Sequence, residues 1–107
     1  IEAMACGKVI VASRVGGLIE LLGSNEERGY LVPLTDTEHS SYDAPMQLPE
    51  HRLQALTDRI VYALTHADEA TTKASEAAAY AKRNFGWQQL VQRVVREAYI
   101  CPSSAVQ

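Results

Sequence analysis

Two short apolar runs in the first third of the chain predict the strands of a parallel sheet. The first run lies in Lys8–Ser13 and is typical of a strand that is buried on both of its faces. The second lies in Arg28–Pro33, where the proline ends it. Between them, Leu18–Leu22 predicts one short helical turn. The apolar residues of the two runs are Val9, Ile10, Val11 and Ala12, then Tyr30, Leu31 and Val32.

Apolar residues at helical spacing predict three helices in the rest of the chain. The helices are expected over His51–Ala67, Glu69–Asn84 and Trp87–Ile100, with Asp68 as the N-cap of the second. The second segment is rich in alanine, which favours a helix and allows a close approach to its neighbours. Trp87 is expected to anchor the third helix by packing. The apolar stripes are Leu53, Leu56, Ile60, Ala63 and Leu64 in the first helix, and Leu90, Val91, Val94, Val95 and Ala98 in the third.

A helix, a strand and a glycine-paired loop follow one another at the start of the chain. Gly7 stands where a left-handed residue would end a helix. Gly16 and Gly17 follow the first strand, where they favour backbone geometry over direct phosphate contact, although a nest of amides remains an alternative. The pattern predicts an α/β fold with two short parallel strands and three or more helices. Open sheets of this class hold ligands beyond the carboxyl ends of their strands, which is where this loop lies.

Three ordered motifs carry a resemblance to a known family. They are Glu-Ala-Met-Ala-Cys-Gly-Lys with Val-Ile-Val-Ala-Ser and Val-Gly-Gly-Leu-Ile-Glu in residues 2–20, Arg-Gly-Tyr-Leu-Val-Pro in 28–33, and Phe-Gly-Trp in 85–87. In this wording the chain resembles retaining glycosyltransferases of family 4, which have the GT-B fold. Val9 replaces a proline of the family pattern and Gly86 replaces a polar residue. Neither change removes a group needed for chemistry.

The resemblance implies that the chain is the carboxyl-terminal part of a Rossmann-like, nucleotide-sugar-binding domain. It implies transfer of a hexosyl group, with retention, from a nucleotide-diphosphate donor to an acceptor that the motifs do not identify. It implies no metal and no cofactor, because amides and basic groups outside this segment neutralise the diphosphate. The final helix is expected to cross back onto an amino-terminal domain of the same protein, so that its Leu90/Val94 face is partly bare in this segment.

Glu2 is the residue to which the resemblance assigns nucleotide-sugar binding. It matches the second of two family glutamates, which accepts hydrogen bonds from the ribose hydroxyls of the donor; the first would precede Ile1. The chemistry fits, because a carboxylate offers two coplanar oxygens to the two donors of a vicinal diol. Glu20 either braces the short turn after the glycine pair or approaches the ligand, and the structural role is favoured. No catalytic residue is expected within the segment.

The first residue suggests that the sequence is a piece of a longer protein. Ile1 opens the chain inside a predicted helix with no capping residue before it. We therefore expect residues 1–100 to form a segment of a donor-binding domain that is inactive alone, and 101–107 to form a frayed tail. The polar stretch 36–49 is expected to be an exposed insertion. With only two strands, exposed apolar edges are expected to make the segment self-associate.

Composition argues against several other classes of protein. A formal net charge of −3 gives no electrostatic reason to expect nucleic acid as a partner. Cys6 and Cys101 match no metal or redox spacing, so reduced thiols in a cytoplasmic protein are expected, with membrane-peripheral attachment through the amino-terminal domain as an alternative. His39, His51 and His66 fit no metal-ligand pattern. No apolar run reaches the ~20 residues of a spanning helix.

Two alternatives from other classes stay open. One is an epimerase or phosphorylase relative with the GT-B architecture, which does not share the Glu-Ala-Met-Ala-Cys-Gly wording. A glutamate eight positions before Glu2 would argue against it. The other is a non-enzymatic interaction module in which the three helices bind a partner. Saturable binding of a nucleotide sugar would exclude that module.

Overall fold

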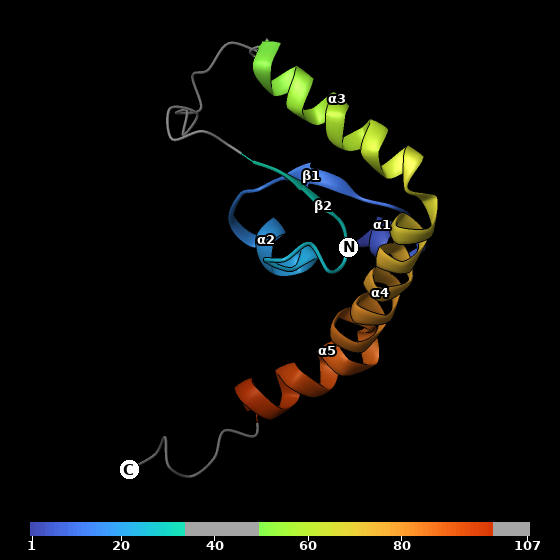
Figure 1. Ribbon diagram of the computed structural model, residues 1–107. Helices are drawn as coiled ribbons and strands as arrows, with labels where there is room; N and C mark the ends of the chain where they lie inside the picture. The colour runs from blue at the N-terminus through green and yellow to red at the C-terminus, as the bar shows by residue number, and fades with distance from the viewer. Residues whose placement is uncertain (34–49, 100–107) are drawn as a thin grey trace.

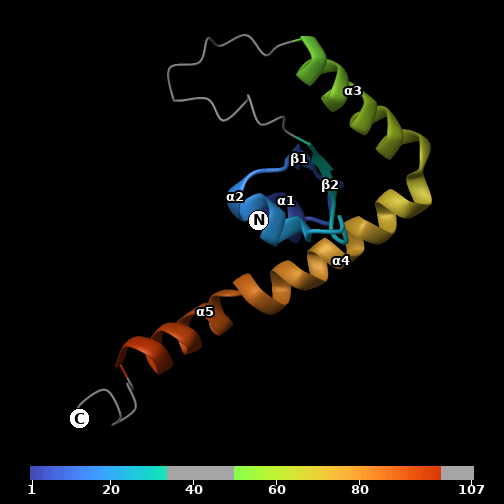
Figure 2. The same ribbon diagram turned by 60° about the vertical axis from the view of Figure 1, so that its left-hand side comes forward.

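In the computed structural model, which describes residues 1–33 and 50–99, two parallel strands lie on the inner side of an arc of helices. Figures 1 and 2 show α3, α4 and α5 forming the arc, with the strands, α1 and α2 within it. The predicted α/β class is confirmed. In chain order the elements are α1 (Glu2–Ala5), β1 (Val11–Ser13), α2 (Gly16–Leu22), β2 (Tyr30–Val32), α3 (Glu50–Thr65), α4 (Ala67–Phe85), α5 (Trp87–Val94) and a π-helical segment (Val95–Tyr99).

The two strands pair in parallel, with Val11 opposite Tyr30 in the register. The ladder continues one residue beyond β1 at each end. The Tyr30 N–H donates to the Ile10 carbonyl at 2.9 Å, and the Arg14 N–H donates to the Val32 carbonyl at 2.9 Å. Both strands therefore end at the same edge of the sheet, and the loop that follows β1 begins there.

The alternation of side chains along the strands divides the core between the two faces of the sheet. On one face, Val11 and the fully buried Tyr30 pack with Ala63 of α3 and Ala70 of α4. Ile10, one residue before Val11, belongs to a second cluster. That cluster is built on three buried residues, Met4 of α1 with Ala77 and Ala81 of α4. The buried residues that α4 gives to both clusters are alanines, whose small side chains allow a close approach, and Tyr80 and Phe85 pack against the second cluster as well.

The first strand is shorter and less buried than its apolar run predicts. β1 covers Val11–Ser13, its residues are half-buried, and Val9 is 44% exposed. The prediction of burial on both faces was wrong because, among the described residues, α2 and α3 cover β2 more fully than they cover β1. The predicted turn at Leu18–Leu22 begins earlier, since α2 already includes the glycine pair. β2 matches its prediction and is buried throughout.

The apolar stripe of α3 does not face the core as a whole. Leu53 is 47% exposed and Leu64 is 75% exposed, whereas Ala63 is buried. The side of the helix that faces the core carries Ala63 and Arg59, and Arg59 binds the carboxylate of Glu26 in the loop before β2. The periodicity of the apolar residues alone therefore does not give the orientation of this helix.

Two expectations for the last helices were also wrong. Trp87 does not anchor α5 by packing, because 84% of its surface is exposed and no described residue covers it. Asp68 does not cap α4; His66 occupies the N-cap position, and Asp68 lies in the first turn, where its charge favours the helix dipole. The predicted insertion at 36–49 and the tail at 101–107 lie outside the described residues, as does Ile100.

Candidate functional site

The loop at the carboxyl end of β1 is held by backbone hydrogen bonds on both sides of Arg14. The Arg14 N–H binds the Val32 carbonyl, and the Val15 N–H binds the Ser13 carbonyl at 2.9 Å, which closes a three-residue turn centred on Arg14. α2 then begins at Gly16, whose φ of +41° is a conformation that favours glycine. Gly16 therefore serves backbone geometry, as the sequence predicted, whereas Gly17 is not in the left-handed region.

The side chain of Arg14 is exposed and weakly bound. Its Nη1 and Nη2 atoms both approach one acceptor, the Ser24 carbonyl, at 3.5 and 3.4 Å. These distances lie at the long limit for a hydrogen bond. Among residues 1–33 and 50–99, no carboxylate forms an ion pair with it. The turn therefore presents a cation at the edge where both strands end, and the sequence analysis did not single out this residue.

Glu2 lies in the first turn of α1, and its side chain is fully exposed. A hydrogen bond from its own backbone amide holds the pKa of this carboxyl below its ordinary value. The carboxylate is therefore ionised at neutral pH. Gly7 follows α1 with φ of +66°, so the predicted left-handed stop is confirmed. α1 is fixed to α4 through Met4, which is 1% exposed.

Glu20 contributes to the structure through its backbone. Its carbonyl accepts a hydrogen bond from Arg28 Nη2 at 2.7 Å, and the neighbouring Leu21 carbonyl accepts one from Arg28 Nε at 2.6 Å. The guanidinium also stacks on the Tyr80 ring at 3.9 Å. Arg28 thus braces the end of α2 against α4. The Glu20 carboxylate is exposed and makes no hydrogen bond within the described part of the chain.

A second group of charged residues surrounds Glu26, which the sequence analysis also missed. Glu26 has φ of +60°, and its Oε1 accepts hydrogen bonds from the Leu31 N–H at 2.8 Å and from Arg59 Nη2 at 2.7 Å. Its carbonyl accepts a hydrogen bond from Lys73 Nζ. No local signal predicts this arrangement, because Glu26 stands in an ordinary polar turn and its partners are far along the sequence.

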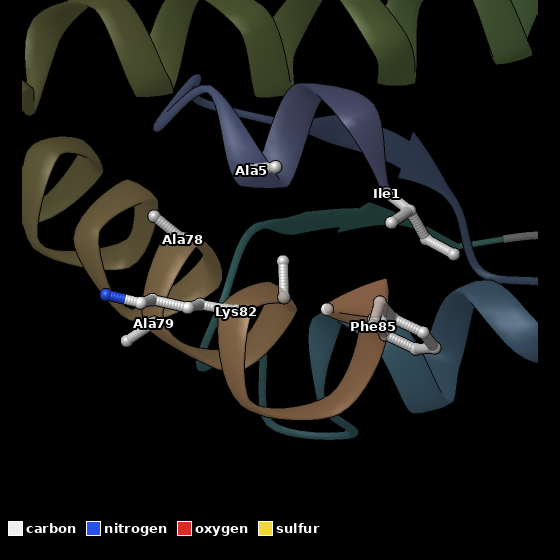
Figure 3. A pocket seen from close by; sticks show the side chains of 8 residues that line it. Ile1, Ala5, Ala78, Ala79, Lys82 and Phe85 are labelled. Atoms are coloured by element: carbon white, nitrogen blue, oxygen red, sulfur yellow. The ribbon is translucent and has the colours of Figure 1, made fainter. Parts of the chain in front are cut away.

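A pocket of about 460 Å³ lies between α1 and the carboxyl-terminal half of α4 (Figure 3). Figure 3 shows Ile1 and Ala5 on one side of it, and Ala78, Lys82 and Phe85 on the other. Among the described residues that line it, Lys82 is the one with a charged side chain, and neither Glu2 nor Arg14 contributes to it. The pocket is therefore separate from the loop at the carboxyl end of β1.

The described residues give no metal-binding group of three or more His, Cys, Asp or Glu side chains. His66 lies at the junction of α3 and α4, where its ring stacks on Tyr62 with centroids 3.8 Å apart. His39 lies outside the described residues. Within the same residues, none of the helices has the length and apolar character needed to cross a membrane.

Comparison with known proteins places residues 1–65 in one family. These residues match the model of a family described as "Glycosyl transferases group 1". The match includes α1, both strands, α2 and α3, and hence Glu2, Arg14 and Glu26. No curated protein and no solved structure matches the chain.

Proposed function

Because the chain belongs to the family of group 1 glycosyl transferases, we propose that it is part of the donor-binding domain of a retaining enzyme. In this proposal the whole protein transfers a sugar, of the hexosyl type, from a nucleotide diphosphate to an acceptor. The two parallel strands and their helices agree with a partial Rossmann-like domain of the GT-B type. The chain supplies binding groups for the donor and is inactive by itself.

The exposed carboxylate of Glu2 is the observation that carries the proposal. It belongs to a short helix that is fixed to α4 by the buried Met4 and is ended by Gly7. The carboxylate is ionised, and the described residues offer it no competing side-chain donor. It is therefore available to accept two charge-assisted hydrogen bonds from the ribose hydroxyls of the donor nucleotide.

The remaining partners follow from the same assignment. The acceptor-binding groups and the first family glutamate belong to other parts of the protein. An amino-terminal domain of the same protein covers the apolar face of α5, where Val91 is 56% exposed and Val94 is 52% exposed. Amides and basic side chains neutralise the leaving diphosphate, and a metal ion is not needed.

Binding of nucleotides to the protein at its full natural length tests the assignment of Glu2. Calorimetric titration with UDP, GDP and ADP identifies the base, and the Glu2→Gln variant is then compared with the wild type. Glu2→Gln keeps the shape but loses the charge, and we expect about tenfold weaker binding because charge-assisted hydrogen bonds are lost. Glu76→Gln, an exposed position on α4, is the matched control and is expected to bind as the wild type does.

Two results would contradict the proposal. Unchanged nucleotide affinity in Glu2→Gln would remove Glu2 from the site. Absence of saturable binding by any of the three nucleotides to the wild type would remove the donor-binding function itself and favour a non-enzymatic module. Where transfer is measured, the anomeric configuration of the product reports retention, and the 107-residue chain alone is expected to give no turnover.

A further inference from the structure

We propose that Arg14 binds the diphosphate of the donor and so provides one of the neutralising cations from within this chain. The inference rests on the proposed function, because it assumes that a nucleotide diphosphate binds beside the carboxyl end of the sheet. It goes beyond that function by naming a residue to which neither the sequence analysis nor the family match assigned a role.

Backbone hydrogen bonds fix the position of the main chain from which the Arg14 side chain extends. Its N–H extends the parallel ladder to Val32, and the Val15 N–H closes the turn onto Ser13. Arg14 is therefore the central residue of a turn that is tied to both strands. The backbone that carries the cation therefore needs little ordering when a ligand binds, which reduces part of the entropic cost of the contact.

Arg14 uses fewer of its N–H donors than two other arginines in the same fold. Arg28 donates hydrogen bonds to two carbonyls at 2.6 and 2.7 Å and stacks on the ring of Tyr80. Arg59 is paired with the Glu26 carboxylate at 2.7 Å. Arg14 has only the Ser24 carbonyl, at 3.4 Å or more. Most of its five N–H donors therefore remain available.

The chemistry of the guanidinium matches the ligand. Its planar array of donors fits two oxygens of a phosphate group at once, and it stays charged at every physiological pH. Its place also matches, because ligands of open α/β sheets bind beyond the carboxyl ends of the strands. Ser13 and Val32, the last residues of β1 and β2, are the residues to which this turn is bound.

The ratio of diphosphate to monophosphate affinity tests the proposal in the protein at its full natural length. Arg14→Gln preserves a side chain that reaches Ser24 but removes the charge. We expect the variant to bind the nucleoside diphosphate about tenfold more weakly, with a clearly smaller effect on the corresponding monophosphate. Arg14→Lys keeps the charge but lacks the planar pair of N–H donors. Its affinity for the nucleoside diphosphate is expected to lie between those of the wild type and Arg14→Gln. Arg83→Gln, an exposed arginine near the end of α4, is the matched control.

The outcomes separate this inference from the proposed function. If the wild type binds the diphosphate and Arg14→Gln leaves the affinity ratio unchanged, Arg14 is not a phosphate-binding residue, while the donor-binding function stands. If the wild type binds none of UDP, GDP and ADP, both are overturned. If Arg14→Gln unfolds at a lower temperature than the wild type, Arg14→Lys decides, because an affinity ratio unchanged in that variant refutes bidentate phosphate binding.

Discussion

The Oε1 atom of Glu26 lies 2.7 Å from Nη2 of Arg59. Together the two side chains cover the outer edge of β2, the edge that faces away from β1. The carboxylate accepts the Leu31 N–H at 2.8 Å, and Arg59 Nε donates to the Leu31 carbonyl at 3.3 Å. The two backbone groups that point away from β1 are thus bound by side chains. A strand cannot pair at Leu31 without displacing this ion pair, so β2 is protected from edge-to-edge association.

Replacement of Glu26 is expected to lower stability by an amount that depends on the backbone of the new residue. Glu26→Ala loses both hydrogen bonds and leaves Arg59 unpaired, so we expect the free energy of unfolding to fall by about 1–3 kcal/mol. Glu26→Gly loses the same bonds but relieves the left-handed backbone conformation, and it is expected to be about 1 kcal/mol more stable than Glu26→Ala.

Urea unfolding at neutral pH measures these differences. Glu76→Ala, an exposed glutamate on α4, serves as the control and is expected to change stability little. If Glu26→Ala proved as stable as this control, the ion pair would contribute nothing to holding α3 against β2. If Glu26→Gly were the less stable of the two Glu26 variants, the left-handed backbone would not be a source of strain.

Tyr30 is expected to destabilise the protein through its hydroxyl group at neutral pH. The residue is fully buried, and its hydroxyl has no hydrogen-bond partner among the described residues. Tyr30→Phe removes that polar group and keeps the ring, so we expect the free energy of unfolding to rise by about 1 kcal/mol. A fall in stability would instead show that the hydroxyl is hydrogen-bonded in solution.

The same residue predicts how stability depends on alkaline pH. Burial, followed by the charge of Glu69, raises the pKa of Tyr30, and a hydrogen bond to Glu69 raises the pKa of Tyr62. The folded state therefore holds these protons more tightly than the unfolded chain. The contribution of these two tyrosines to stability is constant below the ordinary tyrosine pKa of about 10 and falls as pH rises through the higher folded-state values. Tyr30→Phe and Tyr62→Phe are each expected to reduce this alkaline loss, which urea unfolding across the alkaline range would detect.

The elements with local signals were predicted well from the sequence. Gly7 ends α1 because only a left-handed residue fits there, and β2 follows from three apolar residues ended by a proline. The orientation of α3 had no such signal, because its contact through Arg59 is with Glu26, in a distant part of the chain. The exposure of Trp87 was missed for a related reason. An apolar stripe on a helix indicates that this face is buried in the protein, but it does not indicate which element or domain covers it.

The candidate site was predicted only in part, since its chemistry is not local either. Glu2 was found through the family motif, and its exposure agrees with a binding role without testing it. Arg14 carries no signal in the sequence, where it is one of several arginines. Its availability becomes visible only when the hydrogen bonds of Arg28 and Arg59 are compared with its own.

Two glycines are expected to respond in opposite ways to the same substitution. A Cβ atom on the buried Gly29 would lie 3.0 Å from the Ile10 carbonyl oxygen and from Leu22 Cδ2, where the backbone oxygen cannot move aside without disturbing the ladder. We expect Gly29→Ala to cost about 1–3 kcal/mol. Gly17 has open space around it and lies inside α2, so Gly17→Ala is expected to stabilise by about 0.5–1 kcal/mol. Thermal unfolding of the two variants checks both signs, and equal effects would contradict the difference in packing.

The apolar face of α5 is expected to drive self-association of the isolated 107-residue chain. Val91, Val94 and Val95 are 40–56% exposed, and Trp87 and Tyr99 are more so, whereas the outer edge of β2 is protected by Glu26. Because these valines are about half-buried already, burial of the rest of each contributes on the order of 1 kcal/mol, and association through this face should be measurable. Val91→Gln combined with Val94→Gln is expected to weaken this association by about tenfold or more.

Thr71→Gln with Ser75→Gln, at exposed positions of α4, is the matched control and should associate as the wild type does. Sedimentation equilibrium over a wide range of concentrations distinguishes the two double variants, and association that survives unchanged in the α5 variant would show that another surface is responsible.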